Sequence, residues 1–400
     1  MINTPRRALA LSALACAAAL ALPAYAVDAD PVVLTFSSVG DSRQDPNTFD
    51  KASVGTALSG QDAIWLQNTK AYARILRTIQ SQKASMLFFN GDMIQGYGWA
   101  GFGYTTNLTQ TAITGPVAPA SVSDMLNSDL VKTYQQYSFW RGMVAPVLET
   151  GTYVFPVPGN HEVQCKPCGK KAQVENESAW AANMGDLIVD TARFTGIHGA
   201  APQNVSYGPA AGLGPDGLST DQSKLSYSFD FKGAHFAVIN TDPVGKDARA
   251  PTNWLAADLA AAKGRGAKKL FVFGHKPAYT YAYLKNSTTS AAGLEAAPGT
   301  VAERDAFWSV IETNGATYFA GHEHIYNIMR PRGGAYQVIV GAGGSPFEAK
   351  SSDVTKNPAT DRSYSWVTVK LRQSGAVEIT GYGFDEHFGP TSVIEQINLP

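Results

Sequence analysis

Five short segments place carboxylate, amide or imidazole side chains directly after a glycine. The segments are Gly40-Asp41, Gly91-Asp92, Gly159-Asn160-His161-Glu162, Gly274-His275 and Gly321-His322-Glu323-His324. Oxygen and imidazole donors in such a mixture suit Zn, Mn or Fe ions, or a mixed pair of them. Because a pair of divalent ions can activate water and polarise a substrate oxygen, these residue types predict a two-metal hydrolase.

Each segment follows an apolar run that is typical of a β-strand. The runs are Val32–Phe36, Met86–Phe89, Val154–Val157, Leu270–Phe273 and Tyr318–Ala320. Strands that alternate with helical stretches predict an α/β sheet whose active crevice lies beyond the carboxyl ends of the strands. The five segments would therefore deliver their polar side chains to one edge of the sheet.

The remaining elements follow from hydrophobic periodicity and turn residues. Helical spacing predicts helices over Gln61–Lys83, Leu126–Val144, Ser178–Phe194, Asn253–Ala262 and Val301–Thr313. The Lys232-Gly233 turn joins two apolar runs and predicts a hairpin. Two stretches are predicted to be loops, Gly96–Pro119 and Asn204–Ser223. Late strands are expected at Tyr336–Val340, Ser365–Leu371 and Val377–Thr380.

Taken in order, the five segments resemble the signature of the calcineurin-like metallophosphoesterases. That signature runs D-x-H, GD, GNH with a following acid, GH and GHxH. Four of the five blocks are intact here, and the match extends from Asp41 to His324. The resemblance implies a metallophosphoesterase-type α/β fold: a β-sandwich flanked by helices, with the metal site at the strand C-terminal ends. The late strands would then belong to the second sheet.

The resemblance also implies a ligand set for two divalent or mixed-valence metal ions, of which Zn, Mn or Fe are expected. The first ion would be held by Asp41, Asp92 and His324, and the second by Asp92, Asn160, His275 and His322. Asp92 would bridge the pair, since a carboxylate offers two equivalent oxygens. One residue separates His322 from His324, so on an extended segment both imidazoles lie on the same face.

The first block departs from the family pattern at Arg43, where a histidine is usual. A guanidinium has no lone pair for a metal. Purple acid phosphatases, distant members of the family, also lack this histidine and use a tyrosine three residues after the bridging aspartate, where this chain has Gln95. Tyr97 is a less favoured substitute. We expect Arg43 to hold a substrate phosphate oxygen, because its geometry favours bidentate contacts. The first ion would then be completed by water and bound more weakly.

His161 is the candidate general acid, because it follows Asn160 on the same turn and could protonate a leaving alkoxide. Glu162 is expected to anchor that turn by hydrogen bonds. His198, His235 and His387 match no motif and are expected to be ordinary core or surface residues. The run Gly341–Gly344 lacks the Lys-Ser/Thr of a P-loop, which favours a close-packed turn near the metals.

Cys165 and Cys168 form a C-x-x-C segment shortly after Glu162. A zinc site would need further partners, and a thioredoxin-like redox pair would need a helix start, which Gly169 does not favour. A disulfide is the favoured interpretation for an exported protein with two mature cysteines.

Residues 1–26 have the pattern of a bacterial signal peptide. A basic start precedes the apolar stretch Ala8–Leu22, and Ala24-Tyr25-Ala26 supplies a small-x-small cleavage site. Cys16 as a lipoprotein cysteine is a less favoured alternative. No later segment holds about 18 uninterrupted apolar residues, so no stable membrane anchor is expected and the mature protein should be periplasmic or secreted.

The net charge limits which partners are expected, and the chain length limits the number of domains. Without its leader the chain has a small acidic excess, whereas nucleic-acid binding usually needs a basic patch, so no nucleic-acid partner is expected. Residues 27–400 are predicted to be one phosphoesterase domain with long loop insertions. The oligomeric state has no signal in the sequence.

These residues together predict an exported enzyme that hydrolyses a small phosphate ester by attack of a hydroxide held between the metals. A monoester is favoured, because Arg43 adds a cation for a dianion. A phosphodiesterase acting on nucleotides or lipid headgroups is the close alternative. A phosphate- or metal-binding protein with a degenerate site is a third interpretation, which the retained His161 disfavours.

Overall fold

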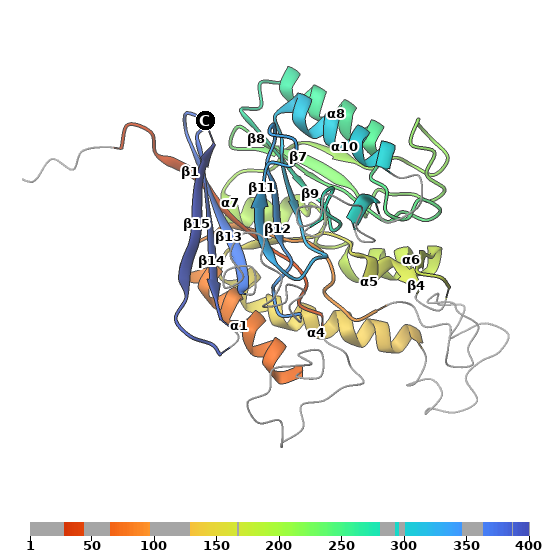
Figure 1. Cartoon of the computed structure of the whole chain (residues 1–400), viewed down its shortest axis with the longest axis horizontal. Coiled ribbons are helices and arrows are strands. Elements are labelled where there is room, and N and C mark those ends of the chain that lie inside the picture. Colours follow the sequence, from red (N-terminus) through yellow and green to blue (C-terminus); the bar gives the residue numbers. More distant parts are fainter. Residues whose placement is uncertain are drawn as a thin grey trace, which may run out of the picture.

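Two β-sheets pack face to face, and helices cover both outer surfaces (Figure 1). The arrangement comes from a computed structural model that describes residues 28–43, 65–96, 129–165, 168–280, 293–295, 301–345, 363–385 and 387–399. The predicted signal peptide and almost all of the predicted loop Gly96–Pro119 lie outside these residues. No described helix has the length and apolarity that crossing a bilayer requires.

The first sheet has six strands in the order β15-β14-β13-β1-β2-β3. Its strands are β1 (Val32–Val39), β2 (Met86–Phe89), β3 (Tyr153–Pro156), β13 (Tyr364–Arg372), β14 (Val377–Phe384) and β15 (Ser392–Leu399). The strands β1, β2 and β3 are parallel, so their carboxyl ends meet at one edge. The late strands β13 to β15 add an antiparallel extension to this sheet rather than to the other.

The second sheet has seven strands in the order β11-β12-β10-β9-β8-β7-β6. Its strands are β6 (Gln203–Tyr207), β7 (Tyr227–Phe231), β8 (Ala234–Val238), β9 (Lys269–Phe273), β10 (Thr317–Ala320), β11 (Tyr326–Met329) and β12 (Gln337–Val340). The strands β8, β9, β10 and β12 are parallel. Two further strands, β4 (Gln164–Cys165) and β5 (Lys171–Ala172), form a small separate hairpin.

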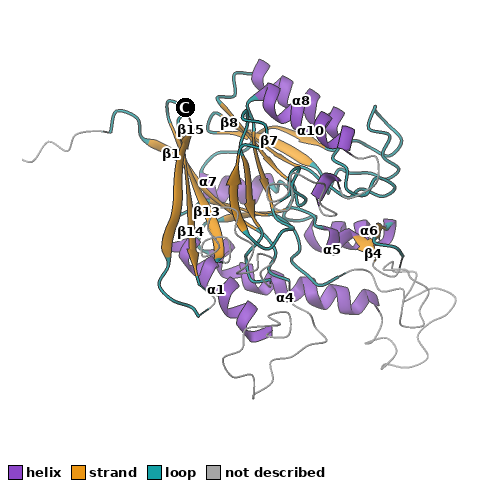
Figure 2. Cartoon of the chain, in the orientation of Figure 1, coloured by secondary structure: helices purple, strands orange, loops and turns teal. Residues whose placement is uncertain are grey.

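The helices lie on the outside of the sheets (Figure 2). They are α1 (Trp65–Ser81), α4 (Asp129–Glu149), α5 (Asn160–Val163), α6 (Val174–Met184), α7 (Thr191–His198), α8 (Thr252–Gly264) and α10 (Val301–Asn314), with a 3₁₀ turn η2 at Gly293–Glu295. Of these, α1, α4, α8 and α10 lie in crossovers between parallel strands. The helices α1 and α4 cover the outer face of the first sheet, where Ile75 and Trp140 pack with Leu87. The helices α8 and α10 cover the second sheet, where Leu255 and Phe307 pack with Val272.

Aromatic rings fill the interface between the two sheets. Phe36 of the first sheet makes edge-to-face contacts with Phe236, Phe271 and Phe319 of the second. Phe88 stacks on Phe273 with ring centroids 3.8 Å apart. Large rings bury much apolar area each, so this layer holds the two sheets in a set relative position. The polar strand ends of both sheets therefore meet at a defined edge.

Most predicted elements are confirmed, including the β-sandwich flanked by helices. The single helix predicted over Ser178–Phe194 is wrong: α6 ends at Met184, and α7 begins after Asp190, whose carboxylate accepts hydrogen bonds from the N–H groups of Ala192 and Arg193. Such a cap satisfies backbone donors that a continuous helix would not expose. The loop predicted over Asn204–Ser223 is wrong in its first part, where β6 forms an edge strand. The strands β11 and β15 have no counterpart among the predictions.

Candidate metal centre

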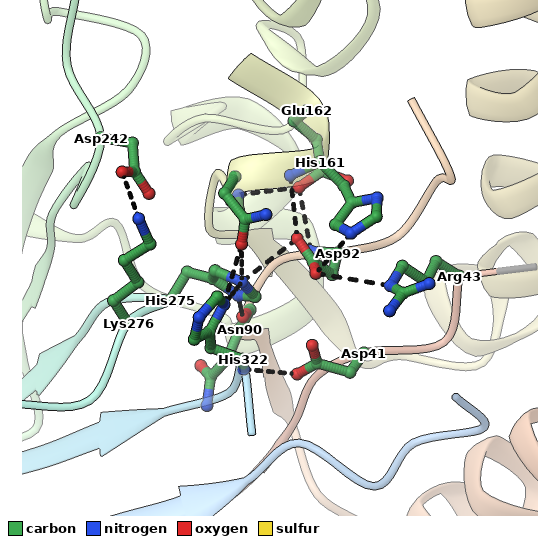
Figure 3. A network of polar contacts seen from close by, with 12 residues as sticks. Asp41, Arg43, Asn90, Asp92, His161, Glu162, Asp242, His275, Lys276 and His322 are labelled. Atoms are coloured by element: carbon green, nitrogen blue, oxygen red, sulfur yellow. Dashed lines mark hydrogen bonds and ion pairs between the residues drawn. The ribbon is translucent and has the colours of Figure 1, made fainter. Parts of the chain in front are cut away.

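The ligand residues predicted from the sequence converge where the parallel strands of both sheets end. Asp41, Asp92 and Asn160 follow β1, β2 and β3 of the first sheet, and the predicted histidine ligands follow β9 and β10 of the second. Figure 3 shows the carboxylates and imidazoles pointing toward one another across this edge. The structure thus brings together all six predicted ligands, from two sheets that approach face to face.

Four donor atoms form a compact cluster, which we call the second donor group: those of Asp92, Asn160, His275 and His322. Asn160 Oδ1 lies 2.9 Å from His275 Nε2 and 2.8 Å from His322 Nδ1. His275 Nε2 lies 3.1 Å from His322 Nδ1 and 3.1 Å from Asp92 Oδ1. Ligands bonded to one ion at about 2.1 Å necessarily lie about 3 Å apart, so this spacing suits a single metal ion.

The surroundings of His275 favour a positive charge at this cluster, carried by the protonated ring or by a bound metal ion. Its Nδ1 donates to the carbonyl oxygen of Asn90 at 2.7 Å, because a carbonyl can only accept. A neutral His275 therefore turns a lone pair toward the oxygens of Asn160 and Asp92, which are acceptors too. Although burial lowers the pKa of His275, the Asp92 carboxylate outweighs this and raises it to about 9. A backbone carbonyl behind the imidazole is a frequent arrangement for a metal-ligating histidine.

The remaining predicted ligands, Asp41 and His324, form with Asp92 what we call the first donor group. Their ligand atoms all lie within 4.8 Å of one another, and His324 Nε2 is 3.6 Å from Asp41 Oδ1. Asp41 Oδ2 accepts a hydrogen bond from the backbone N–H of His322, but Oδ1 is buried and has no hydrogen-bond partner in the described part of the chain. Burial raises the pKa of Asp41 well above its usual range. An unsatisfied buried carboxylate oxygen beside an imidazole fits a second cation.

Asp92 belongs to both donor groups, and its pKa is shifted in the opposite direction to the pKa of Asp41. Burial opposes its ionisation, yet the neighbouring His161 and His275 side chains and the Arg43 guanidinium hold the pKa of Asp92 well below its usual range. Its Oδ1 faces His275, and its Oδ2 lies 3.6 Å from the Nε2 atom of His161. A carboxylate that faces both groups fits the predicted bridging position.

Three of the six ligand residues have a left-handed backbone. The φ angles are 61° at Asp41, 54° at Asp92 and 71° at His322. Non-glycine residues rarely adopt positive φ, and such strain clusters at functional sites. The surrounding structure therefore holds these backbones in costly conformations in order to aim the side chains.

Close approach of the backbone explains two of the nearby glycines. A Cβ atom added at Gly159 would lie 2.4 Å from Asp92 Oδ1, and one at Gly341 would lie 2.9 Å from Asp41 Oδ2. Only glycine leaves room for the carboxylates at these points. The run Gly341–Gly344 is thus the close-packed turn near the site that the sequence predicts.

Glu162 ties the loop after β2 to the turn after β3. Its carboxylate accepts hydrogen bonds from the backbone N–H groups of Gly159, Asp92, Met93 and Ile94, at 2.7, 2.9, 2.8 and 3.2 Å. Burial raises the pKa of Glu162 to about 7, and the N–H groups of Asp92 and Ile94 oppose that rise. The anchoring role predicted for Glu162 is confirmed, and its reach extends to the loop that carries Asp92.

His161 and Arg43 lie on the same side of Asp92. His161 donates from Nδ1 to the carbonyl oxygen of Gln95 at 2.6 Å. Burial lowers the pKa of His161 well below its usual value. Arg43 places Nε 3.6 Å from Asp92 Oδ2 and Nη2 3.5 Å from the Nε2 atom of His324. Both residues are therefore within reach of a group bound over the shared carboxylate. Tyr97, the less favoured ligand, lies outside the described residues.

Sequence reasoning missed a buried ion pair beside the second donor group. Lys276 Nζ lies 2.6 Å from Asp242 Oδ1, and both side chains are almost fully buried. Figure 3 shows the pair next to His275, with the lysine directed away from the ligand cluster. The signal was a lysine directly after the predicted ligand His275 and before the apolar run Pro277-Ala278-Tyr279. Asp242, assigned a turn role from the sequence, also accepts from Gln164 Nε2 and the backbone N–H of Ala248.

The predicted disulfide is present between Cys165 and Cys168. It closes the small β4–β5 hairpin, which directly follows α5. His235 is a core residue, as predicted, with Nδ1 2.6 Å from Asp230 and Nε2 2.8 Å from Asp258. His198 packs on Phe194, far in sequence from any ligand.

Comparisons with known proteins agree with this geometry. Residues 65–326 match the sequence model of the calcineurin-like phosphoesterases. No curated protein matches the chain by sequence.

Solved structures of low sequence identity resemble the fold. A purple acid phosphatase from seeds of yellow lupin (Lupinus luteus) is 13% identical with a TM-score of 0.53; the alignment covers 91% of this chain and 53% of the lupin chain. The chain thus spans about half the length of that protein. A dimetal phosphatase from Danio rerio is 11% identical with a TM-score of 0.47, covering 92% of this chain and 99% of the other. Since the family match extends over more than half of its length, the chain belongs to the calcineurin-like phosphoesterases.

Proposed function

We propose that this chain is an exported, metal-dependent hydrolase of small phosphate esters, with monoesters preferred over diesters. The observation that carries the proposal is the pair of donor groups that share Asp92. Carboxylate oxygens and imidazole nitrogens converge there, and the buried Asp41 Oδ1 has no hydrogen-bond partner among the described residues. Family membership implies a dinuclear centre, and the donor types suit Zn, Mn or Fe. When bound, two such ions would activate the attacking water and polarise the phosphoryl group.

In this proposal, Asp41, Asp92 and His324 hold the first ion, and Asp92, Asn160, His275 and His322 hold the second. Asn160 and the histidines are neutral donors, so they bind metal without cancelling its charge. The site therefore keeps a net positive field for an anionic ester.

His161 would protonate the leaving oxygen from Nε2 after its ring takes up a proton in the substrate complex, where Asp92 and the bound anion favour the charged ring against the effect of burial. Its Nδ1 is engaged by the carbonyl oxygen of Gln95, which fixes the ring with Nε2 toward the shared carboxylate. General-acid catalysis of this kind typically contributes about 10²–10⁴ in rate. Arg43 would contact a phosphate oxygen, because its guanidinium lies beside both Asp92 and His324. A dianionic monoester gains more from this added cation than a monoanionic diester does.

Export is part of the proposal and rests on two features. Residues 1–26 have the sequence pattern of a leader, and Cys165 pairs with Cys168. Disulfides persist in oxidising compartments such as the bacterial periplasm.

Hydrolysis of p-nitrophenyl phosphate and bis-p-nitrophenyl phosphate by metal-stripped protein, with Mn²⁺, Zn²⁺ or Fe added back, tests this function. We expect metal-dependent turnover, faster with the monoester. Asp92→Asn should abolish it and His161→Ala should lower it by about 10²–10⁴. Asp230→Asn, the same change in a cluster that contains none of the predicted ligands, is the matched control. Tight metal binding without turnover of either ester would instead support a binding protein.

A further inference from the structure

Gln95 contacts both residues that the proposed function places against the substrate. Its backbone carbonyl accepts from His161 Nδ1 at 2.6 Å, and its side-chain Oε1 accepts from Arg43 Nη1 at 3.1 Å. The first contact belongs to the backbone and survives any substitution. The second depends on the amide side chain. Gln95 therefore links the candidate acid and the candidate phosphate contact through separable groups.

The loop that carries Gln95 is held from two sides. Glu162 accepts from the N–H groups of Met93 and Ile94 before it. Gln136 of α4 accepts from the N–H of Gly96 after it, at 3.1 Å. A hydrogen-bond acceptor on so firmly anchored a backbone can in turn fix a flexible partner.

Arg43 is such a flexible partner. An arginine side chain has many rotamers, and each fixed contact reduces the cost of ordering the guanidinium when an anion binds. The Gln95 oxygen engages Nη1, while Nε and Nη2 remain directed to Asp92 and His324. The guanidinium therefore lies against the first donor group with its position set in advance.

We propose that Gln95 is a positioning residue that holds the Arg43 guanidinium over the first donor group and thereby sets the preference for a phosphate dianion. This inference rests on the proposed function. It assigns the preference to a pair of residues, Arg43 and Gln95, that contact each other across 52 positions of sequence. Arg43 departs from the D-x-H block of the family signature, so at this position the chain offers a cation to substrate and not a ligand to metal.

A double-mutant cycle tests the proposal. We expect Gln95→Leu, which keeps the side-chain size but removes the acceptor, to raise KM for p-nitrophenyl phosphate about tenfold with kcat changed by less than about threefold. The KM for bis-p-nitrophenyl phosphate should change much less. In an Arg43→Ala background the same Gln95→Leu change should have almost no effect, because its effect passes through Arg43. Gln136→Leu is the matched control: it loosens the same loop and should leave the monoester-to-diester ratio unchanged.

Inorganic phosphate binding to the metal-loaded proteins, measured by calorimetry, gives a readout that needs no turnover. Gln95→Leu should weaken it about tenfold, again only when Arg43 is present. Equal effects of Gln95→Leu with and without Arg43, or an equal shift with Gln136→Leu, would overturn the positioning role. Should wild-type protein bind phosphate but hydrolyse neither ester, the proposed function fails while the cycle on phosphate affinity still decides the role of Gln95. Gln95→Met replaces Gln95→Leu if the latter does not fold.

Discussion

The two donor groups share Asp92 yet differ in closeness and charge. In the second group, His275 Nε2 lies 2.9 to 3.1 Å from donor atoms of Asn160, His322 and Asp92, and Asn90 fixes the ring of His275 from behind. In the first group, His324 Nε2 and Asp41 Oδ1 are 3.6 Å apart. A guanidinium nitrogen of Arg43 lies 3.5 Å from the same His324 atom. One side of the shared carboxylate is thus closed by two histidines and an amide, and the other contains the permanent cation of Arg43.

This difference bears on affinity. A fixed positive charge a few ångströms from a divalent ion is repulsive, whereas neutral donors add bonds without repulsion. We therefore expect the second group to bind its ion tightly and the first to bind its ion weakly. The first side would be the one that exchanges ligands with substrate.

Removing one histidine from each donor group is the most direct test of the expected difference in metal affinity. His275→Ala should eliminate the tightly held ion and abolish hydrolysis, because it removes a donor from the centre of the closed group. His324→Ala should eliminate only the weakly held ion. Elemental analysis of metal after dialysis distinguishes the two. Equal loss of metal in both variants would contradict the asymmetry.

Arg43→His would sharpen the comparison by restoring the residue that the family usually has. It adds a lone pair and removes a fixed cation, so we expect the first group to bind its ion at least about tenfold more tightly. Competition with a chelator measures this. Arg43→Lys keeps the charge without the histidine ligand and is the control. If Arg43→His leaves the metal affinity unchanged, Arg43 is not what weakens metal binding by the first donor group.

Glu162→Gln tests the clamp that holds both groups in register. The carboxylate accepts four backbone N–H groups, and an amide nitrogen in its place would face donors. We expect a loss of about 2–3 kcal/mol in the free energy of unfolding, measured by denaturant titration of the metal-free protein. Glu175→Gln, a partly exposed acid in α6, should cost far less. A similar loss in both variants would argue against a clamp.

The smallest effect on stability is expected at the cluster of His235, Asp230 and Asp258. This cluster contains no residue of either donor group and so serves as a reference for them. Although burial opposes it, hydrogen bonds from His235 to Asp258 and Asp230 raise the pKa of this histidine, with Arg265 also bound to Asp230. The protonated form is thus favoured in the folded state. Its stabilisation should be complete below the ordinary histidine pKa of 6.5 and be lost as pH rises through the raised value.

Thermal melting of wild type and His235→Gln from pH 5.5 to 9 checks this. The variant should be most destabilised at the acid end, and the difference should shrink toward pH 9, while metal content stays equal. A difference that grows with pH would reverse the assignment.

Much of the site could be predicted because its ligands follow strands in a recognisable order. Glycine next to Asp92, Asn160 or His322 is a local signal, since these turns need close approach or an unusual φ. The contacts of Gln95 and Lys276 could not be predicted from local sequence, because their partners Arg43 and Asp242 are distant in the chain. The break between α6 and α7 was also missed, since helical periodicity continues through the residues that end one helix and cap the next.

The sequence by itself determined the donor types, their order and the strands that carry them, because local spacing encodes each strand and turn. It also determined that Arg43 departs from the D-x-H block of the family signature. Only the tertiary structure decided that Arg43 and Gln95 touch, that Asp92 faces both groups and that one group is tighter than the other. Those properties depend on how closely two sheets approach across an aromatic core, which is set by packing between segments far apart in the chain.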